Sequence, residues 1–499
     1  MLQLLIACHT NSHAPDDRTT LPSSDTADPS DSDLDDTADG YAGPDPFAEQ
    51  EDTSEGLTNV SADLRALLEN GSLDGACEAW EADPDDQRKK LLCGKWMFFY
   101  EAFDTLGPPA QLYDFYAQNF SDTMGEGFSK YGLVADPYSK HGRNLGMGTG
   151  KPLGEVEALA YTCASCHFGQ LPDGRYAVGA PNYAYDYGRH TLALGLLAKA
   201  VVPGWSEEDH NERAIELIRP ELNALADDWW LQMDFFFVLM GMINIETEVE
   251  MDISIEAEGH YANWRTGTMD FLIEPLPLDD GIHTIHKILP LWSIPTEEEI
   301  AAYDMPSAML SWTGAGTDLY QFLEGFILIG GGTLDEWPRE RLAPLVEYIH
   351  SLRAPENLNP PDASLAATGE ALFYDAGCID CHDGARGSSR EVFTLDEIGT
   401  DMALQYFSDL DQDGVPCCGL DETSDNALTH GVKAPRIDGV FWMNRLLHNG
   451  SGSSLDELLC VGGERTPITE WAYGNDGHLY GCELSPTEKA SLIAFLESI

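Results

Sequence analysis

Two five-residue segments constrain this chain more than any other feature. Residues 163–167 read CASCH and residues 378–382 read CIDCH, so each segment holds two cysteines followed directly by a histidine. This Cys-x-x-Cys-His pattern is the attachment signature of c-type haem, in which two thiols bond the vinyl groups and the histidine binds iron. The sequence therefore predicts covalent haem at Cys163, Cys166, Cys378 and Cys381, with iron bound through His167 (haem 1) and His382 (haem 2).

Each motif has an alternative interpretation. A redox-active Cys-x-x-Cys pair or half of a zinc site also begins with two cysteines at this spacing. Zinc would need further ligands at matching spacing, and the sequence has no such cluster beside either motif.

The remaining cysteines predict disulfides. The chain has 11 cysteines, of which the motifs use Cys163, Cys166, Cys378 and Cys381. Apart from Cys8, the others are Cys77, Cys93, Cys417, Cys418, Cys460 and Cys482. An even remainder favours disulfides in an oxidising compartment, and buried free thiols are the alternative. Cys77 with Cys93 is the favoured pair, since both lie on consecutive helical segments, whereas the pairing of the last four stays open.

The N-terminal region suggests export. Residues 1–8 end in LIAC, which resembles a bacterial lipobox and predicts a truncated lipoprotein-type signal with lipid on Cys8. The usual basic start is missing, so a plain apolar stub is the alternative. Residues 9–60 are acidic and polar, which predicts a disordered linker. No later apolar run is long enough to span a membrane. We expect a periplasmic protein, or an outer-membrane or cell-surface lipoprotein, of a Gram-negative bacterium.

The net charge of the chain limits the classes of partner that can bind it. The chain has 86 acidic and 27 basic residues, a formal charge of -59. Such a surface repels nucleic acid and attracts cations, so we expect no nucleic-acid partner and a small, basic redox protein as electron donor or acceptor.

Apolar spacing predicts a mainly α protein. Helical periodicity covers residues 76–103, 112–120, 192–202, 212–225, 229–245, 319–329, 339–352, 364–375 and 487–499. Residues 353–363 carry three prolines and divide the chain. We expect two cytochrome c-like haem domains, at 61–355 with an N-terminal helical extension and long helical insertions, and at 364–499.

Several blocks outside the two motifs follow a known pattern. They are 305–306 (MP), 311–314 (SWTG), 367–373 (ATGEALF), 433–440 (KAPRIDGV), 447–451 (LHNGS), 454–458 (SLDEL) and 475–481 (NDGHLYG). With them, residues from about 160 to 499 resemble the bacterial di-haem cytochrome c peroxidase superfamily, closest to its rubber-oxygenase-like branch. The resemblance implies that haem 2 is a six-coordinate electron relay, whereas haem 1 has a face where peroxide or dioxygen binds.

The same resemblance nominates further ligands. Relatives often place a methionine ligand of haem 2 after the block at 454–458, but no methionine follows Leu455 here. His478 occupies that stretch and becomes the expected sixth ligand, with His448 as runner-up and a turn histidine as the alternative. Peroxidases place a removable histidine soon after the first motif. The candidates for haem 1 are His190, His260, His283 and His286, and none is strongly placed.

Other residues have two interpretations each. Trp312 either passes electrons between the haems, as a tryptophan does in relatives, or belongs to the core. Phe322 and Phe326 either line the haem 1 pocket or are core residues. Glu246 and Glu248 are candidates for the acid that assists cleavage of the peroxide bond.

An acidic loop matches the first half of a calcium-binding loop. Asp409, Asp411 and Asp413 alternate along the chain, and Gly414 follows. The bidentate glutamate expected later is replaced by Leu420. Bound calcium and a solvated acidic loop both remain open.

Together these features predict an exported di-haem c-type cytochrome. We expect an oxidoreductase that uses peroxide or dioxygen at haem 1, with haem 2 as relay. The alternative is a non-catalytic periplasmic electron-transfer cytochrome with two six-coordinate haems.

Overall fold

A computed structural model of the full chain provides the coordinates. It describes residues 57–69, 73–105, 107, 110, 113–114, 117, 128–139, 142–151, 157–188, 190, 265–270, 285–314, 316–401, 431–470 and 472–499.

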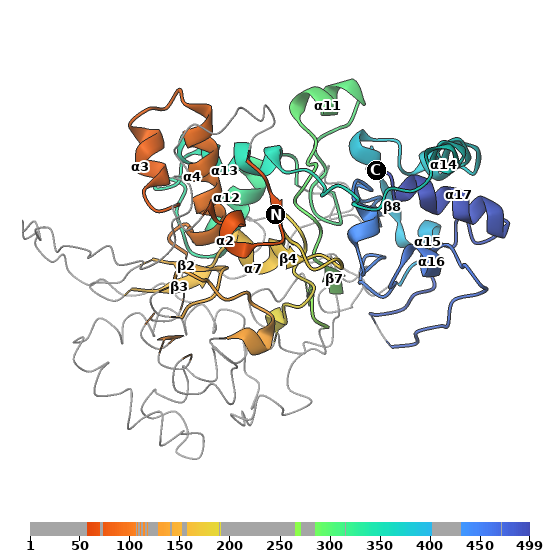
Figure 1. Ribbon diagram of the computed structural model, residues 1–499, viewed down its shortest axis with the longest axis horizontal. Coiled ribbons are helices and arrows are strands. Elements are labelled where there is room, and N and C mark those ends of the chain that lie inside the picture. The colour runs from red at the N-terminus through yellow and green to blue at the C-terminus, as the bar shows by residue number, and fades with distance from the viewer. Residues whose placement is uncertain are drawn as a thin grey trace, which may run out of the picture.

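Helices of the first half gather at one end of the molecule (Figure 1). They are α2 (Leu64–Leu67), α3 (Ala76–Glu81), α4 (Gln87–Tyr100), α12 (Leu319–Ile329) and α13 (Arg339–Ser351), whereas α11 (Glu297–Ala302) lies between this end and the opposite one. The Asp86 side chain caps α4 by accepting from the Lys89 amide at 3.1 Å. A Cβ at Gly94 would lie 2.1 Å from the Pro344 carbonyl oxygen, so only glycine lets α4 and α13 come this close.

Two helices of the second half form the opposite end (Figure 1). They are α14 (Ala363–Asp375) and α17 (Pro486–Leu496). Ser485 and Glu488 form a capping box that begins α17. A Cβ at Gly369 would lie 1.9 Å from the Ser491 carbonyl oxygen, so this glycine permits the close packing of α14 on α17. The short helices α15 (Leu395–Ile398) and α16 (Leu455–Leu458) lie nearby.

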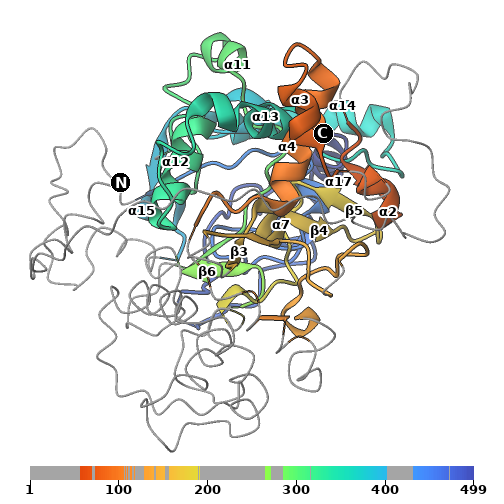
Figure 2. The same cartoon turned by 90° about the vertical axis from the view of Figure 1, so that its left-hand side faces the viewer.

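The strands are short and every pair is antiparallel. They are β1 (Val60–Ser61), β2 (Met147–Thr149), β3 (Leu159–Tyr161), β4 (Phe168–Gln170), β5 (Tyr176–Val178), β6 (Thr268–Asp270), β7 (Ile285–Lys287), β8 (Val392–Thr394) and β9 (Gly431–Lys433). The sheets have the orders β1-β5-β4, β2-β3, β6-β7 and β8-β9. The short helix α7 (Cys163–His167) connects β3 to β4, so two of these sheets flank the first motif (Figure 2).

One hydrophobic cluster contains residues of both halves. Phe98 and Trp292 belong to it, as do Phe373 and Leu492. The indole of Trp292 donates to the Asp438 carbonyl at 2.9 Å, which links the two parts of the chain. Residues 353–362 form an irregular segment between α13 and α14, where the sequence predicted the division. The two haem-binding domains stay a prediction.

The helix predictions agree with the structure where it describes the chain. α12 has the predicted bounds, and α13 and α14 differ from theirs by one residue at one end. The segment 76–103 divides into α3 and α4, because the turn at Asp83-Pro84 interrupts the helix. The helices predicted at 192–202, 212–225 and 229–245 lie outside the described residues, as does most of 112–120.

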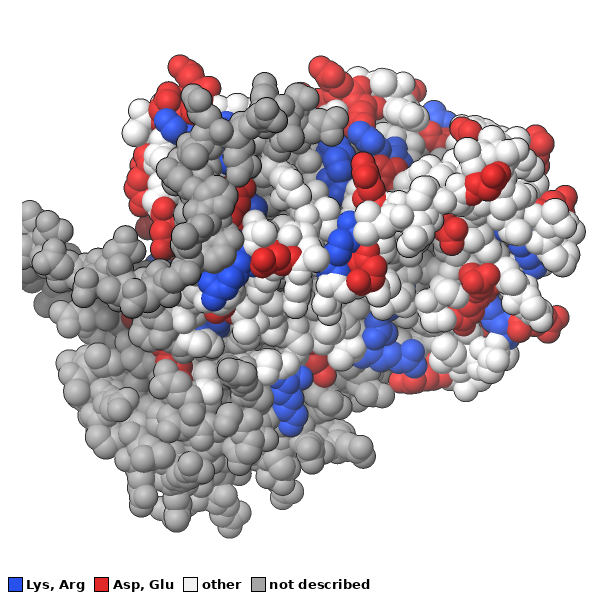
Figure 3. All heavy atoms as spheres, viewed as in Figure 1, with Lys and Arg blue, Asp and Glu red and all other residues white. Residues whose placement is uncertain are grey.

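The mainly α class stays a prediction, since the described residues combine helices with these short strands. None of the described helices is long and apolar enough to cross a membrane. Acidic side chains gather toward both ends of the face in Figure 3, and several basic side chains lie near its middle.

Candidate functional site

The first Cys-x-x-Cys-His motif forms α7, and neighbouring chain segments satisfy its backbone groups. Asn182 Nδ2 donates to the Ser165 carbonyl at 3.1 Å, and the Asn182 amide donates to the Cys166 carbonyl at 2.8 Å. The Gly179 amide donates to the His167 carbonyl at 2.8 Å. These bonds satisfy the last carbonyls of the helix and hold the motif against the segment that follows β5.

His167 is enclosed and uncharged. Burial lowers the pKa of its imidazole to about 4, the backbone of Leu289 opposes this, and the charge of Arg436 adds to it. Its Nδ1 atom is buried and has no hydrogen-bond partner among the described residues. A neutral imidazole is the form that binds a metal.

The second motif forms the 3₁₀ turn η4 (Cys378–Asp380), which runs into His382. The His382 amide donates to the Cys378 carbonyl at 3.1 Å. The ring atom Nδ1 lies 2.6 Å from the Gly387 carbonyl, and a carbonyl only accepts, so Nδ1 carries the proton. Burial, and next the charge of Lys433, lower the pKa of His382 despite this bond. The bond to Gly387 therefore fixes the orientation of the neutral ring.

The described cysteines divide into two groups. Cys163, Cys166, Cys378 and Cys381 are free thiols. Cys77–Cys93 and Cys460–Cys482 are disulfides. The predicted Cys77–Cys93 pair is thus confirmed, and Cys460–Cys482 is one of the pairings that the sequence left open. Cys417 and Cys418 lie outside the described residues, as does Cys8.

Three of the four motif thiols, Cys163, Cys378 and Cys381, are held in their protonated form. Burial raises the pKa of Cys163 to about 12, and it raises the pKa of Cys378 and Cys381 as well. Redox-active Cys-x-x-Cys pairs have a cysteine whose pKa is lowered by nearby positive charge. This environment therefore disfavours the alternative of a dithiol redox centre.

His478 lies beside the second motif. Burial lowers its pKa to about 4, and His382 is the next cause, so the two rings lie within electrostatic reach of each other. The backbone of His478 has a φ of 55°, a left-handed conformation that is uncommon outside glycine. The predicted ligand is thus placed close to His382, from a loop distant in sequence.

Arg465 holds the loop that carries His478. Its guanidinium donates to the carbonyls of Asn475 and Gly477, both at 2.7 Å, and to the His478 carbonyl at 2.6 Å. The His478 amide also donates to the Ile398 carbonyl at 3.3 Å. The sequence analysis missed Arg465, because nothing in its local pattern indicates which distant carbonyls it will bind.

His448 and Trp312 lie side by side. The two rings are 6.4 Å apart in an edge-to-face arrangement. His448 Nδ1 lies 3.2 Å from the Thr400 hydroxyl. The Trp312 indole donates to the Lys287 carbonyl at 3.0 Å, and the side chain is 5% exposed. Burial lowers the pKa of His448 to about 4, and the charge of Lys287 contributes to the same shift.

His190 is buried in an aromatic cage. Five aromatic rings surround it at centroid distances of 5.2 to 6.3 Å, and one of them, the Tyr131 ring, stacks on it at 5.3 Å; they are Tyr113, Phe128, Tyr131, Tyr161 and Tyr185. Its Nδ1 atom lies 3.0 Å from the Tyr185 hydroxyl, and Nε2 has no partner among the described residues. Cys166 is among the groups that raise the pKa of Tyr185, after burial and Tyr161, so the cage lies near the first motif.

The remaining predicted residues lie on β7, on α12 or outside the described residues. His286 lies on β7, paired with Met269 of β6. Phe322 and Phe326 contact each other at 5.1 Å on α12, and Phe326 is 48% exposed. The candidates His260, His283, Glu246 and Glu248 and the acidic loop with Asp409, Asp411 and Asp413 lie outside the described residues. No cluster of three or more metal-binding side chains occurs among the described residues.

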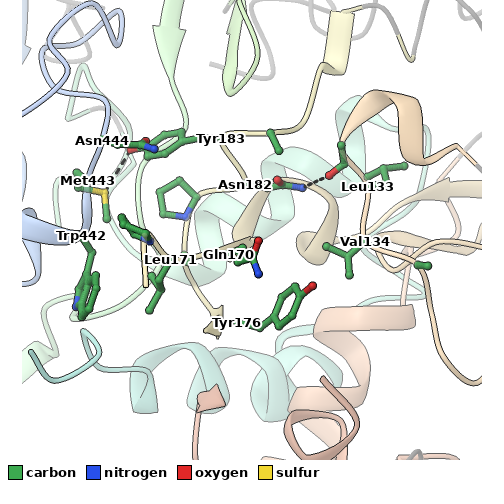
Figure 4. Close-up of a pocket in the computed structure, with 16 residues that line it drawn as sticks. Leu133, Val134, Gln170, Leu171, Tyr176, Asn182, Tyr183, Trp442, Met443 and Asn444 are labelled. Carbon is green, nitrogen blue, oxygen red and sulfur yellow. Dashed lines mark hydrogen bonds between the residues drawn. The ribbon is translucent and has the colours of Figure 1, made fainter. Parts of the chain in front are cut away.

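A cavity of about 550 Å³ lies between the two halves of the chain (Figure 4). Asn182 and Tyr183 line it from the first half, and Trp442, Met443 and Asn444 line it from the second. The Tyr183 hydroxyl donates to Met443 Sδ at 3.3 Å across this boundary. None of the motif cysteines and histidines is among the lining residues, although Asn182 also holds α7.

Comparisons with known proteins add little. No family model and no curated protein matches the chain. A solved structure of hydrazine synthase from Kuenenia stuttgartiensis is similar over 47% of this chain and 77% of that chain, at 17% identity and a TM-score of 0.24. A similarity at this level defines neither fold nor function.

Proposed function

We propose that this chain is an exported c-type cytochrome with two covalently bound haem groups. The observation that carries the proposal is the division of the cysteines: the motif thiols are free, whereas the other described cysteines are paired in disulfides. Each free pair is followed by a half-buried histidine whose pKa is lowered, so that its ring is neutral. These are the groups that hold haem c, and the disulfides suit a compartment outside the cytoplasm.

Bound haem would supply one-electron chemistry and an iron that binds small oxygen species. The chain supplies His167 and His382 as axial ligands. At the second motif, the Gly387 carbonyl oxygen accepts a hydrogen bond from His382 Nδ1 at an N···O distance of 2.6 Å, which fixes the orientation of the ring. Such a bond orients a metal-binding histidine and raises its basicity.

The two sites differ in the partners that the chain offers. The charge of His382 acts on the pKa of His478, and Arg465 holds the His478 loop, which supports His478 as the second axial ligand of haem 2. A pair of histidine ligands closes the iron to small molecules, which suits an electron relay. Among the described residues, no histidine acts on the pKa of His167 in this way. We infer that haem 1 is the site where peroxide or dioxygen binds.

Trp312 is the residue we propose for the electron path. Its carbonyl accepts from the Lys433 amide at 2.9 Å, and Lys433 is a charge that acts on His382. Its indole is anchored on Lys287, so the ring is fixed in a buried position.

One observation favours the electron carrier as a second candidate. His190 is buried near Cys166, and its Nε2 atom has no described partner. If His190 binds the iron of haem 1, both irons are six-coordinate and the protein only transfers electrons.

Electron paramagnetic resonance of the oxidised and the partly reduced protein separates these functions. The oxidoreductase predicts one low-spin and one high-spin haem, at least after partial reduction, with cyanide binding to one of them. Two low-spin haems in every redox state, without binding of cyanide or carbon monoxide, would contradict the oxidoreductase and favour the carrier.

A further inference from the structure

Two basic side chains, the buried Lys433 and the half-buried Arg436, have no adequate counter-charge among the described residues. Lys433 is 1% exposed, and its Nζ atom has no hydrogen-bond partner among the described residues. Arg436 donates through Nη2 to the Pro290 carbonyl at 2.7 Å, but its Nε atom is buried and unpaired there. Burial lowers the pKa of Lys433 far below its usual range and that of Arg436 to about 10. Burial therefore disfavours the charged form of both side chains, and an anion bound beside them would restore it.

Other charges nearby do not balance these two. Lys287 is another buried cation, 4% exposed, whose Nζ donates to the Arg445 carbonyl at 2.5 Å and lies 5.7 Å from the centroid of the Trp312 ring. Asp438 is the acid whose charge acts on Arg436, and it also accepts from Arg386 at 3.5 Å. Although the chain has a net charge of -59, no carboxylate among the described residues bonds to Lys433 Nζ.

The segment that carries the two basic side chains packs beside the second motif, where the Ile437 amide donates to the Arg386 carbonyl at 3.1 Å. Pro290, the partner of Arg436, precedes Leu291, whose amide donates to the Gly179 carbonyl at 2.8 Å, and the Gly179 amide in turn donates to the His167 carbonyl. Arg436 acts on the pKa of His167, and Lys433 acts on that of His382. Arg436 is also the charge that acts on Lys433, so the two cations are neighbours.

Their backbones are fixed to the same structure. The Lys433 amide donates to the Trp312 carbonyl at 2.9 Å, and Lys433 pairs with Val392 across β8 and β9. Arg436 is anchored on Pro290, next to Leu289, whose backbone faces His167. The cations are thus held in place before any anion binds, which lowers the entropic cost of binding.

We propose that Lys433 and Arg436 bind the propionate carboxylates of the two haem groups, with Lys287 as a third positive charge beside them. This inference rests on the proposed function. The motifs account for the iron and the vinyl groups of each haem, and the inference names the residues that bind its propionate groups. Haem carries two carboxylates opposite the region of its vinyl groups. An ammonium and a guanidinium are the side chains that pair with carboxylates by charge-assisted hydrogen bonds.

Reduction potentials test this placement. A buried positive charge near a haem favours the reduced iron, so Lys433→Gln and Arg436→Gln lower the midpoint potentials. We expect at least a tenfold fall in the equilibrium constant for reduction of a haem, which corresponds to about 59 mV for one electron. Lys433→Arg keeps the charge and the potential. The matched control is Arg390→Gln, which removes an exposed cation that pairs with Asp383, the neighbour of His382.

Resonance Raman spectra of the same variants report the propionates directly. The propionate bending bands shift in Lys433→Gln and in Arg436→Gln, but not in Arg390→Gln. Unchanged bands overturn the inference whether or not the potentials fall, and so do potentials that match those of the control. Mass spectrometry of each variant comes first: two haems with unshifted bands reject only this inference, whereas a haem-free wild-type chain rejects the proposed function as well. Both Gln variants remove an unpaired charge, so neither is expected to prevent folding.

Discussion

His382 and His478 lie close enough that a charge on one disfavours a charge on the other. Burial is the larger reason why the pKa of His478 falls to about 4, and His382 is the second. His382 follows the second motif, whereas His478 comes from the loop held by Arg465 near the end of the chain. Two neutral imidazoles are the axial ligands that a bis-histidine, six-coordinate haem requires.

Replacement of His478 tests this relationship. In His478→Gly, the low-spin signal of haem 2 converts to high-spin, because one axial ligand is lost, and the signal of haem 1 does not change. Glycine suits this position, since φ is 55° there, so the loop keeps its conformation. Electron paramagnetic resonance measures the conversion. The comparison variant is His448→Gly, which keeps the low-spin signal; if it loses that signal and His478→Gly does not, His448 is the ligand.

The disulfide between α3 and α4 stabilises the folded chain. Cys77 and Cys93 are separated by 16 positions, and a loop of that size corresponds to about 3 kcal/mol. We expect the double variant Cys77→Ser and Cys93→Ser to lower the free energy of unfolding by about that amount, with both haems retained. Urea unfolding of the holoprotein, followed by circular dichroism, measures it. A loss below about 0.5 kcal/mol would show that the bond adds nothing beyond an ordinary surface change.

Lys95 gives the stability a dependence on pH. It is 1% exposed, and burial lowers its pKa to about 8, while Glu69 at 3.6 Å opposes this shift. In the unfolded chain its pKa returns to the usual 10.5. Between these values the unfolded chain binds more protons, so the contribution of Lys95 to stability rises with pH.

Comparison with a variant isolates this effect. Relative to Lys95→Met, the wild type gains about 3 kcal/mol from pH 8 to pH 10.5 and nothing below pH 8. Urea unfolding of both proteins across this range provides the difference. A constant difference at every pH would contradict a buried, charge-destabilised Lys95.

Local patterns in the sequence predicted some parts of this structure well. The helical periodicity of 319–329 and the two motifs are local, and so is the Cys77–Cys93 pair, whose members lie on adjacent helical segments. The partner of Cys460 was not deducible, because several pairings of the later cysteines were equally compatible with the sequence.

Contacts distant in sequence were the ones missed. The clamp of Arg465 on the His478 loop depends on tertiary packing, and no spacing rule indicates it. Lys433 belongs to a block noted for its resemblance, but its burial without a partner is visible only in the structure. The placement of His478 near His382 was predicted from the resemblance alone and not from any local pattern.

The mass of the denatured protein tests the central claim most directly. The chain is expressed in a host that matures c-type cytochromes, unfolded, and measured by mass spectrometry. Thioether bonds survive unfolding, so we predict the mass of the polypeptide plus two haems. Cys163→Ser with Cys166→Ser removes one haem, and Cys378→Ser with Cys381→Ser removes the other. A haem-free mass for the wild-type chain, from a host that loads a control cytochrome under the same conditions, would contradict the account.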